Sequence, residues 1–490
     1  MLEKIKRDFS TYAKIKVTKP GNSNMEESLM NIVQQAAEKI SQEMSKQFVG
    51  IQNHQLTFAT LVANIHQCVN EIGVAMLETL IQEADYALRQ SPVRKREWHI
   101  QRNEDTKICA TLLGPVKLTR TYYKHKKDGH FSYLLDNYLG ILPYDRIDIG
   151  LESKLLETAT ERSYQQTVEQ FQYSGITSKE TIKNVVHRFN TEELVAETTR
   201  KSQTPTVLFI EADEDHVSYQ DGTNRYMKLV YVHEGYETTV GKNSRKKLKN
   251  CRYFSGLYPD GSKLWEEVYD YLAETYDLKQ VQQIYFSGDG ARWIQEGVKF
   301  IPNTTFVLDR FHMVKYVKKA CIGMTTGASI LLDWIEKDYK SYVEAFFTSR
   351  LNDPTLSANQ QKEIKKAKSY LLGHWKAIQR QKDKNYIGCS AEGHVSHVLS
   401  SRLSSRPLGW SKTGANNIAK IRVFLKNKGN LTVHLEMKTK EIQRKRAIHR
   451  LDKRVTNSKK VFNPYFLAKF PLLENGLITG TRNRVAKAIK

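Results

Sequence analysis

The sequence has few cysteines and no long apolar run. Its five cysteines lie far apart and form no CxxC pair, which argues against a zinc finger or a disulfide framework and favours a reducing cytoplasm. The longest uncharged stretch, residues 47–70, contains Gln, Asn and His throughout, whereas a bilayer span needs about 20 mostly apolar residues. The first 16 residues are charged and lack the apolar centre of a secretory signal. We therefore expect a cytoplasmic protein that makes no contact with membranes.

Two common catalytic motifs are also absent. The sequence has no GxxxxGK(S/T) loop, so it does not indicate ATP use, and no HExxH motif, so it does not indicate a zinc-hydrolase site. Any enzymatic chemistry must therefore come from another arrangement of side chains.

Positive charge is in large excess over negative charge. The 490 residues include 76 Lys and Arg against 53 Asp and Glu, a formal net charge of +23. Residues 412–490 alone hold 20 of the basic residues and four acidic ones, and a second basic cluster lies at 242–252. A single cluster of this kind is often only solvated surface, and a nuclear localisation signal is a weaker alternative. Two clusters in so basic a chain favour contacts with the phosphate backbone of a nucleic acid.

The N-terminal third is expected to be helical and then to change to β structure. Apolar residues recur at helical spacing in residues 23–40 and 55–90, which is typical of a helical pair or a coiled-coil-like dimer element. A β-hairpin is expected at 107–123. Its residues 119–123 mix cationic and aromatic side chains, which suits contact with nucleic acid and equally suits an ordinary hairpin.

Residues 151–190 have the pattern of a helix-turn-helix unit. Helices are expected at 151–160 and 164–171, followed by a third helix that Thr177 and Glu180 begin with a capping box. The third helix has an apolar stripe and a polar, basic front, as a recognition helix in the DNA major groove requires. Its candidates for DNA contact are Lys179, Lys183, Asn184 and Arg188. A small helical bundle without a DNA role is the alternative.

From Thr206 the pattern changes to that of an α/β sheet. Short apolar strands are expected at 207–212, 227–233, 251–258, 283–287 and 305–308. Helices separate the last three strands, which gives the order βββαβαβ and a sheet whose first three strands are antiparallel. From Arg310 to about residue 380 the chain has helical character throughout.

Two aspartates follow strands of this expected sheet. Asp213 comes directly after the first strand, and Asp289 follows the fourth. Ends of neighbouring strands can lie close together, and two carboxylates there repel each other unless a cation bridges them. Carboxylate oxygens select Mg²⁺ or Mn²⁺, and two such ions can serve the attacking and leaving oxygens of a phosphodiester. Each aspartate alone could be an ordinary turn former, but the strand order and the basic clusters favour the metal site.

Several segments match a known family. They are Arg120–Tyr123, Tyr133–Asp136, Leu139–Gly140, Ala159–Tyr164, Ile210–Val217, Gly288–Ala291, Leu308–His312 and Cys389–Pro407 with Gly409–Trp410. With these segments the sequence resembles the ISLre-type bacterial insertion-sequence transposases, within the Mutator-like DDE group. The block at 389–407 is the most specific of them.

The resemblance implies an RNase H-like catalytic core with a helical insertion at about 313–385. Its catalytic and metal-binding acids would be Asp213, Asp289 and Glu392, acting with two Mg²⁺ or Mn²⁺ ions. It implies cleavage at the ends of a mobile element, which frees 3′-hydroxyls, and attack of these hydroxyls on target DNA.

Two of these three assignments have competitors. Asp215 lies two residues from Asp213 and would share its strand face, so it is an alternative first acid. Glu344 and Glu363, in the expected insertion, compete with Glu392 for the third position. Small neighbours and the lack of a close basic residue favour Glu392, since they would let DNA and metal approach.

Four further residues are expected near this site. Asp309 and His312 form the acid-x-x-His pattern of the Mutator group, either as a hydrogen-bonded pair in the wall of the site or as a direct contact to the transferred strand. Arg402 and Arg406 follow Glu392 and are expected within reach of flanking phosphates.

We therefore expect a bacterial DDE transposase with an α/β RNase H-like core, an all-α insertion and a preceding, mainly helical DNA-binding region. Its expected divisions are a helical region (1–93), a β-hairpin and basic region (94–150), a helix-turn-helix-like region (151–200), the catalytic core (201–411) and a basic C-terminal region (412–490). Its expected partners are the double-stranded DNA of transposon ends and target, and further copies of itself. The rival interpretations are a non-catalytic DNA-binding regulator and a metal-dependent nuclease without strand transfer.

Overall fold

A computed structural model describes residues 23–194, 196–237, 247–258, 261–406 and 409–461. The chain divides into two compact units, and each is described here by itself. Unit 1 comprises residues 1–148 and 435–490, and unit 2 comprises residues 149–434. This division is coarser than the five expected regions, and it places residues 151–200 and 412–434 in the same unit as the larger sheet.

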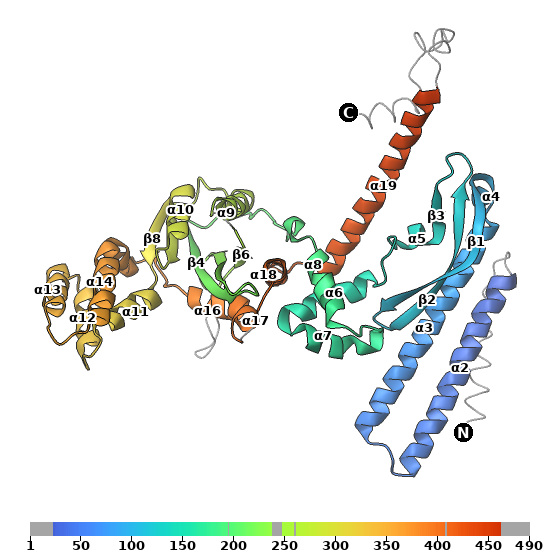
Figure 1. Cartoon of the computed structure of the whole chain (residues 1–490), viewed down its shortest axis with the longest axis horizontal. Coiled ribbons are helices and arrows are strands. Elements are labelled where there is room, and N and C mark those ends of the chain that lie inside the picture. The colour runs from blue at the N-terminus through green and yellow to red at the C-terminus, as the bar shows by residue number, and fades with distance from the viewer. Residues whose placement is uncertain (1–22, 195, 238–246, 259–260, 407–408, 462–490) are drawn as a thin grey trace, which may run out of the picture. The chain divides into compact units, whose positions relative to one another are not determined.

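Unit 1 is a helical hairpin against a small antiparallel sheet. Its elements are α2 (Ser23–Gln52), α3 (Phe58–Gln90), α4 (Pro92–Glu97), β1 (Trp98–Thr111), β2 (Gly114–His125), β3 (Phe131–Tyr133) and α5 (Leu134–Leu139). Figure 1 shows α2 and α3 side by side as two long helices. The strands β1 and β2 are longer than the predicted hairpin at 107–123, and β3 adds a third strand next to β2.

A buried carboxylate joins the helical hairpin to the sheet. Asp85 of α3 accepts hydrogen bonds from the backbone N–H of Thr121 at 3.0 Å and from its hydroxyl at 2.6 Å. On the same helix, Glu78 accepts from the Lys117 N–H at 2.7 Å. These contacts fix β2 along α3, because a buried carboxylate is costly unless it is hydrogen-bonded.

Unit 2 begins with three short helices. They are α6 (Ile149–Glu161), α7 (Tyr164–Phe171) and α8 (Lys179–Arg188), with the 3₁₀ turns η1 (Gln172–Ser174) and η2 (Thr191–Glu193). The predicted capping box at Thr177 is wrong, because α8 begins one residue later: Ser178 is the N-cap and its side chain accepts from the Glu180 N–H at 3.1 Å. The predicted apolar stripe is buried, with Ile182, Val185 and Val186 facing the unit's interior.

A five-stranded mixed sheet forms the centre of unit 2. Its elements are β4 (Val207–Ser218), β5 (Asn224–His233), β6 (Arg252–Gly256), α9 (Ser262–Thr275), β7 (Gln283–Gly288), α10 (Arg292–Phe300) and β8 (Thr304–Leu308). The predicted order βββαβαβ is confirmed. The strands lie in the order β6-β5-β4-β7-β8, with β4, β5 and β6 antiparallel and β4, β7 and β8 parallel.

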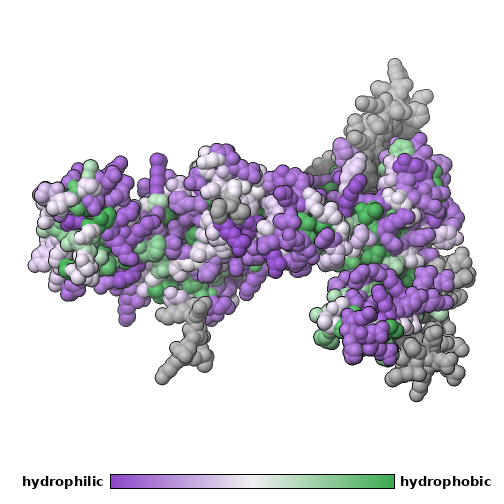
Figure 2. Space-filling model, turned by 60° about the horizontal axis from the view of Figure 1, so that its bottom comes forward, coloured by the Kyte–Doolittle hydropathy of each residue, from purple (hydrophilic) through white to green (hydrophobic). Residues whose placement is uncertain are grey.

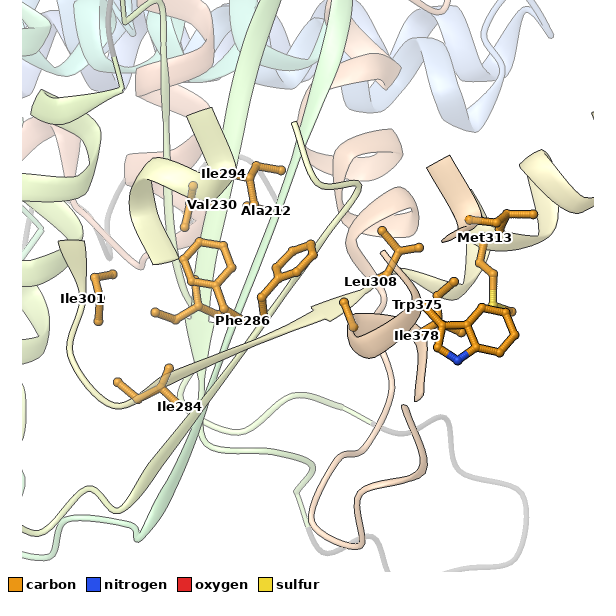
Figure 3. Packing of buried hydrophobic residues seen from close by; sticks show 14 of the residues in the cluster. Ala212, Val230, Ile284, Phe286, Ile294, Ile301, Leu308, Met313, Trp375 and Ile378 are labelled. Carbon is orange, nitrogen blue, oxygen red and sulfur yellow. The ribbon is translucent and has the colours of Figure 1, made fainter. Parts of the chain in front are cut away.

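The helical insertion after β8 shares the core of this sheet. It contains α11 (Arg310–Ala320), α12 (Gly327–Glu336), α13 (Lys340–Leu351), α14 (Ala358–Gly373), α15 (Trp375–Gln379) and η3 (Arg380–Lys382), and no strand is described in it. Figure 3 shows Ala212, Phe286 and Leu308 of the sheet packing in one cluster with side chains from α10, α11 and α15. The insertion also covers the β8 edge, where Arg380 donates to the Phe306 carbonyl at 2.9 Å.

The chain then returns across the opposite face of the sheet. Tyr386 and Ile387 pack on a smaller cluster made by β4, β7 and β8. The elements that follow are α16 (Ala391–Val395), a π-helical turn (Ser396–Ser400), α17 (Ser401–Leu403) and α18 (Lys412–Lys426). Helix α19 (Leu431–Val461) begins in unit 2, and its residues from Leu435 on belong to unit 1. Helix α18 joins the three short helices to the sheet, since Asn417 donates to the carbonyls of Val186 and Phe189 at 2.8 and 3.0 Å.

Figure 2 shows hydrophilic residues over most of the face that it presents, with hydrophobic residues in separate patches. Among the described residues, no helix combines the length and the apolar character that a membrane crossing requires.

Candidate active site

Three aspartates lie on or directly after neighbouring strands of the larger sheet. Glu211 of β4 pairs with Ser287 of β7, and Ser287 pairs with Val307 of β8. Side chains alternate along a strand, so residues two positions further on each strand return to the same face. Those residues are Asp213, Asp289 and Asp309. Asp289 and Asp309 follow directly after their strands as expected, but Asp213 does not, because β4 continues through it to Ser218.

The Asp213 carboxyl lies in a buried, negatively charged environment. Asp213 as a residue is 6% exposed, and one of its carboxylate oxygens accepts a hydrogen bond from the Glu214 N–H at 2.8 Å. Burial raises the pKa of Asp213 to about 7, and the charges of Asp289 and Glu392 add to the rise. The Glu214 N–H and His312 act in the opposite direction. The three acids expected from the sequence are therefore close enough for the charges of Asp289 and Glu392 to raise the pKa of Asp213.

The helical insertion holds the turn that carries Asp289. The Asp289 carboxylate accepts from the Ala291 N–H at 2.8 Å, and the Tyr370 hydroxyl of α14 donates to the Asp289 carbonyl at 2.6 Å. Between them Gly290 has φ of +83°, and a Cβ there would lie 2.5 Å from Nε2 of His374. The positive φ favours glycine, and any other residue here would also displace the His374 side chain.

Glu392 is exposed in the first turn of α16, and a buried carboxylate on β4 anchors that helix. Glu211 accepts from the Ser390 N–H at 2.6 Å and from His233 Nε2 at 3.0 Å, and Tyr231 also donates to it. Burial alone would raise the pKa of Glu211, but the hydrogen bond from His233 and the others outweigh it and lower the pKa. Glu211 is therefore a charged anchor that places the start of α16 beside β4.

A second carboxylate on the same strand face holds the end of this helical segment. Asp215 accepts from the hydroxyls of Ser400 and Ser404 at 3.0 and 2.8 Å. Glu211, Asp213 and Asp215 alternate along β4, and the outer two bind the segment 390–404. This arrangement favours Asp213 over Asp215 as the acid that faces Asp289.

Asp309 and His312 form the predicted hydrogen-bonded pair. Asp309 caps α11 by accepting from the Phe311 N–H at 3.1 Å, and its second oxygen lies 3.0 Å from His312 Nδ1. Burial opposes protonation of His312, but the bond to Asp309 and the charges of Asp213 and Asp289 outweigh it and raise its pKa. The imidazole is therefore biased towards its cationic form beside the acids.

The carboxylates offer oxygen ligands only, which suits Mg²⁺ or Mn²⁺ rather than zinc. Within the described residues, the ligand atoms of Asp213, Asp289 and Glu392 do not all lie within 4.8 Å of one another. Binding of two ions between them would therefore require these carboxylates to move closer together. Glu392 is exposed, whereas Asp213 is buried.

The candidates for DNA contact on α8 are accessible. Lys179, Asn184 and Arg188 are exposed, and Lys183 is half-buried. Arg188 pairs with Glu152 of α6 at 2.8 Å, and Lys183 pairs with Glu180 at 2.9 Å. These surface pairs are weak and can exchange for phosphate.

The two arginines after Glu392 differ from each other. Arg406 is exposed as expected. Arg402 is buried: it donates to the Ala159 carbonyl at 3.0 Å and lies over the Trp410 ring, 4.6 Å from its centre. Burial lowers the pKa of Arg402 to about 10. The expectation that Arg402 contacts phosphate is therefore corrected, because its side chain ties α17 to α6.

A model of an uncharacterised protein family, UPF0236, matches residues 51–441 of this chain. The chain belongs to the UPF0236 family. Two UPF0236 proteins of Caldanaerobacter subterraneus subsp. tengcongensis are 38% identical to it over 402 residues, which covers 82% of this chain and 85% of each relative. A UPF0236 protein in the vanSb 3′ region of Streptococcus gallolyticus is 29% identical over 355 residues, 67% of this chain and 74% of the relative.

The UPF0236 match contains every residue of the candidate site, including some that the sequence interpretation passed over. Those are Glu211 and Ser390, which anchor α16, and the serines that bind Asp215. The spacing of two between the acids at 211, 213 and 215 is the available signal, since it places all three on one face of a strand. From the sequence alone it was applied only to Asp213 and Asp215, because the strand was expected to end at Ala212.

Proposed function

We propose that this UPF0236 protein is a DNA transposase that cleaves phosphodiester bonds at the ends of a mobile element and joins the freed 3′-hydroxyls to target DNA. The sheet β6-β5-β4-β7-β8 would be an RNase H-like core, and Asp213, Asp289 and Glu392 its catalytic acids. The observation that carries the proposal is the convergence of these acids from separate parts of the chain. Their electrostatic coupling at Asp213 supports it most directly.

A pair of Mg²⁺ or Mn²⁺ ions is the cofactor that fits these residues. A buried carboxyl with a pKa near 7 is poorly stabilised as an anion by the protein alone, and a divalent cation would supply the missing stabilisation. When bound, the two ions activate the attacking oxygen and stabilise the leaving oxygen. Asp213 and Asp289 would hold them from the sheet, and Glu392 from α16.

The surrounding residues would orient this site. Asp309 fixes the ring of His312, and the raised pKa of His312 favours a positive charge beside the acids. A cationic imidazole there offsets the repulsion among the carboxylates and can donate a hydrogen bond to a phosphate oxygen. Glu211 and Asp215 would be positioning residues, since they hold the segment that carries Glu392.

The charge and the short helices of unit 2 support DNA as the partner. The net charge of +23 favours a polyanion, and Lys179, Asn184 and Arg188 of α8 are exposed. Helix α8 would read the element ends, with Arg406 near a flanking phosphate. Such a protein would act in the bacterial cytoplasm, on the nucleoid.

The helical hairpin of unit 1 supports assembly of copies on DNA. Exposed or half-exposed apolar residues on α3 follow an alternating spacing of four and three, typical of a coiled-coil seam. They are Phe58, Val62, Ile65, Val69, Ile72 and Met76. Helix α2 adds exposed Val33, Ile40, Met44, Phe48 and Ile51. A monomer rarely exposes so extended an apolar surface, so we propose that two hairpins pack together.

The names of two relatives fit a mobile gene. One relative's name joins eleven locus designations of the Caldanaerobacter genome, and another joins four. A name shared by many loci is what repeated insertion of one element would produce.

A joining assay separates the proposal from its rivals. Labelled duplexes that carry the DNA flanking the gene are incubated with the full-length protein, Mg²⁺ and a target plasmid. A transposase cuts the duplex and joins its 3′ end to the plasmid, whereas a nuclease only cuts. A regulator binds the duplex and leaves it intact, and that result would reject the catalytic proposal.

A further inference from the structure

A tight turn in unit 1 brings two histidines and an aspartate together. His125 ends β2, and the turn that follows leads to β3 through Asp128, Gly129 and His130. Two backbone bonds close it: the His125 N–H donates to the His130 carbonyl at 2.8 Å, and the Gly129 N–H donates to the His125 carbonyl at 3.0 Å. Gly129 has φ of +70°, which favours glycine at this position. We call His125, Asp128 and His130 the histidine–aspartate turn.

The three side chains converge on one point. Asp128 Oδ1 lies 2.7 Å from His125 Nδ1 and 2.5 Å from His130 Nδ1, and the three ligand atoms all lie within 4.8 Å of one another. Among the described residues, no other set of three His, Cys, Asp or Glu side chains meets this condition. Trp98 packs edge-on against both imidazoles, with ring centres 4.8 Å apart in each case, so both rings are held in place.

One carboxylate oxygen of Asp128 faces both imidazoles. It can accept a hydrogen bond from the Nδ1–H of each ring, since a carboxylate oxygen has two lone pairs. The same three atoms can instead ligate one metal ion, because imidazole nitrogens and carboxylate oxygens are both metal donors and all three lie together.

We propose that the histidine–aspartate turn binds one divalent transition-metal ion of the zinc class. Two imidazoles and one carboxylate are a donor set for Zn²⁺ and similar borderline ions, and they do not suit Mg²⁺. Ligand bonds in such sites are about 2.0–2.2 Å, so the ligand atoms would sit roughly 3.3 Å apart. Asp128 lies in a surface turn and its side chain is 22% exposed, so a shift of its carboxylate by this small amount leaves the core unchanged.

One lysine of the turn is directed away from this site. Lys126 donates its Nζ to the Lys95 carbonyl at 2.7 Å, which directs its charge away from the imidazoles. A bound ion would lock the end of β2 to the start of β3 and to Trp98. It would thereby stabilise the three-stranded sheet of unit 1, and this role does not depend on the function proposed for unit 2.

The test is metal titration of the full-length protein. The protein is purified without a metal-charged resin, stripped with a chelator, and titrated with Zn²⁺ and, as a spectroscopic probe, with Co²⁺. We expect one tightly bound ion per chain, a Co²⁺ absorption band typical of low coordination number, and no displacement by excess Mg²⁺. Failure of the wild-type protein to bind Zn²⁺ at micromolar concentration would overturn the proposal.

Three variants assign the bound ion to the turn. His130→Ala removes a ligand, and Asp128→Asn removes the charge while keeping a hydrogen-bond acceptor for both rings. Each should weaken Zn²⁺ binding at least about tenfold. The control, His99→Ala, changes an exposed histidine of β1 and should bind as the wild type does. Circular dichroism checks that Asp128→Asn is folded, and wild-type affinity in this folded variant would refute the assignment.

Discussion

Replacing Asp213 with asparagine is expected to stabilise the protein at alkaline pH when no divalent cation is present. The pKa of Asp213 rises from 3.8 to about 7 in the folded protein. A carboxyl with a raised folded-state pKa favours folding while it is protonated, and this contribution is lost as the pH rises from about 4 to 7. At pH 8 the wild-type protein therefore holds the Asp213 side chain as a buried carboxylate near other acids, which destabilises the folded state.

The size of the effect follows from this shift. Each pKa unit corresponds to 1.36 kcal/mol, so the cost at pH 8 is at most roughly 4 kcal/mol. Asparagine keeps an oxygen for the Glu214 N–H and carries no charge, so it removes most of this cost. With about 2–4 °C per kcal/mol for a domain of this size, Asp213→Asn should raise the Tm by several degrees.

The assay is thermal unfolding of both proteins at pH 5 and pH 8, with chelator or with Mg²⁺. Chelated wild-type protein should lose stability between the two pH values, and Mg²⁺ should restore it at pH 8. Asp213→Asn should show a smaller pH dependence and little response to Mg²⁺. Glu266→Gln, an exposed position on α9, is the matched control and should behave as the wild type. Identical pH and Mg²⁺ responses in wild type and Asp213→Asn would refute the reasoning.

Three further predictions concern DNA binding, assembly and the wall of the site. Arg188→Ala should weaken binding to element ends in a gel-shift titration. If Arg188 reads a base, the loss is about 1–3 kcal/mol with relaxed specificity; if it contacts phosphate, the loss is the same for all sequences and the salt dependence is flatter. Unchanged binding would mean that α8 is a structural helix without a role in DNA binding. Val69→Lys places a charge in the exposed seam of α3 and should convert a dimer into a monomer in light scattering, while Gln67→Lys should not. His312→Ala should fold and bind DNA but lose most cleavage and joining, and wild-type rates in that variant would remove His312 from the site.

The order of strands and helices along the chain, βββαβαβ, could be predicted because the strands are short apolar runs separated by turn signals. The length of β4 could not, because residues 213–215 are all acidic and acids are rare in buried strands. They are tolerated because Asp213 to Asp215 pair with β5 and because Asp215 has serine partners from a distant helix. The prediction of a strand end at Ala212 followed local propensity, and tertiary contacts overrode it.

The candidate site could be predicted only in part for the same reason. Asp213 and Asp289 are recognisable as acids next to apolar strands. The contact that brings Glu392 towards them joins Glu211 to Ser390, 179 residues later, and no local pattern reveals it. The burial of Arg402 could not be predicted for the same reason, because the Ala159 carbonyl that it binds lies 243 residues away in the sequence.

Cleavage by Asp289→Asn tests the central claim most directly. The substrate is a labelled duplex carrying the DNA that flanks the gene, incubated with Mg²⁺ and either wild-type or variant protein at saturating concentration. If the acids form one metal-dependent site, the wild-type protein cuts the duplex, and the variant binds it with the same affinity and gives no product. Cutting by Asp289→Asn at the wild-type rate would contradict the account.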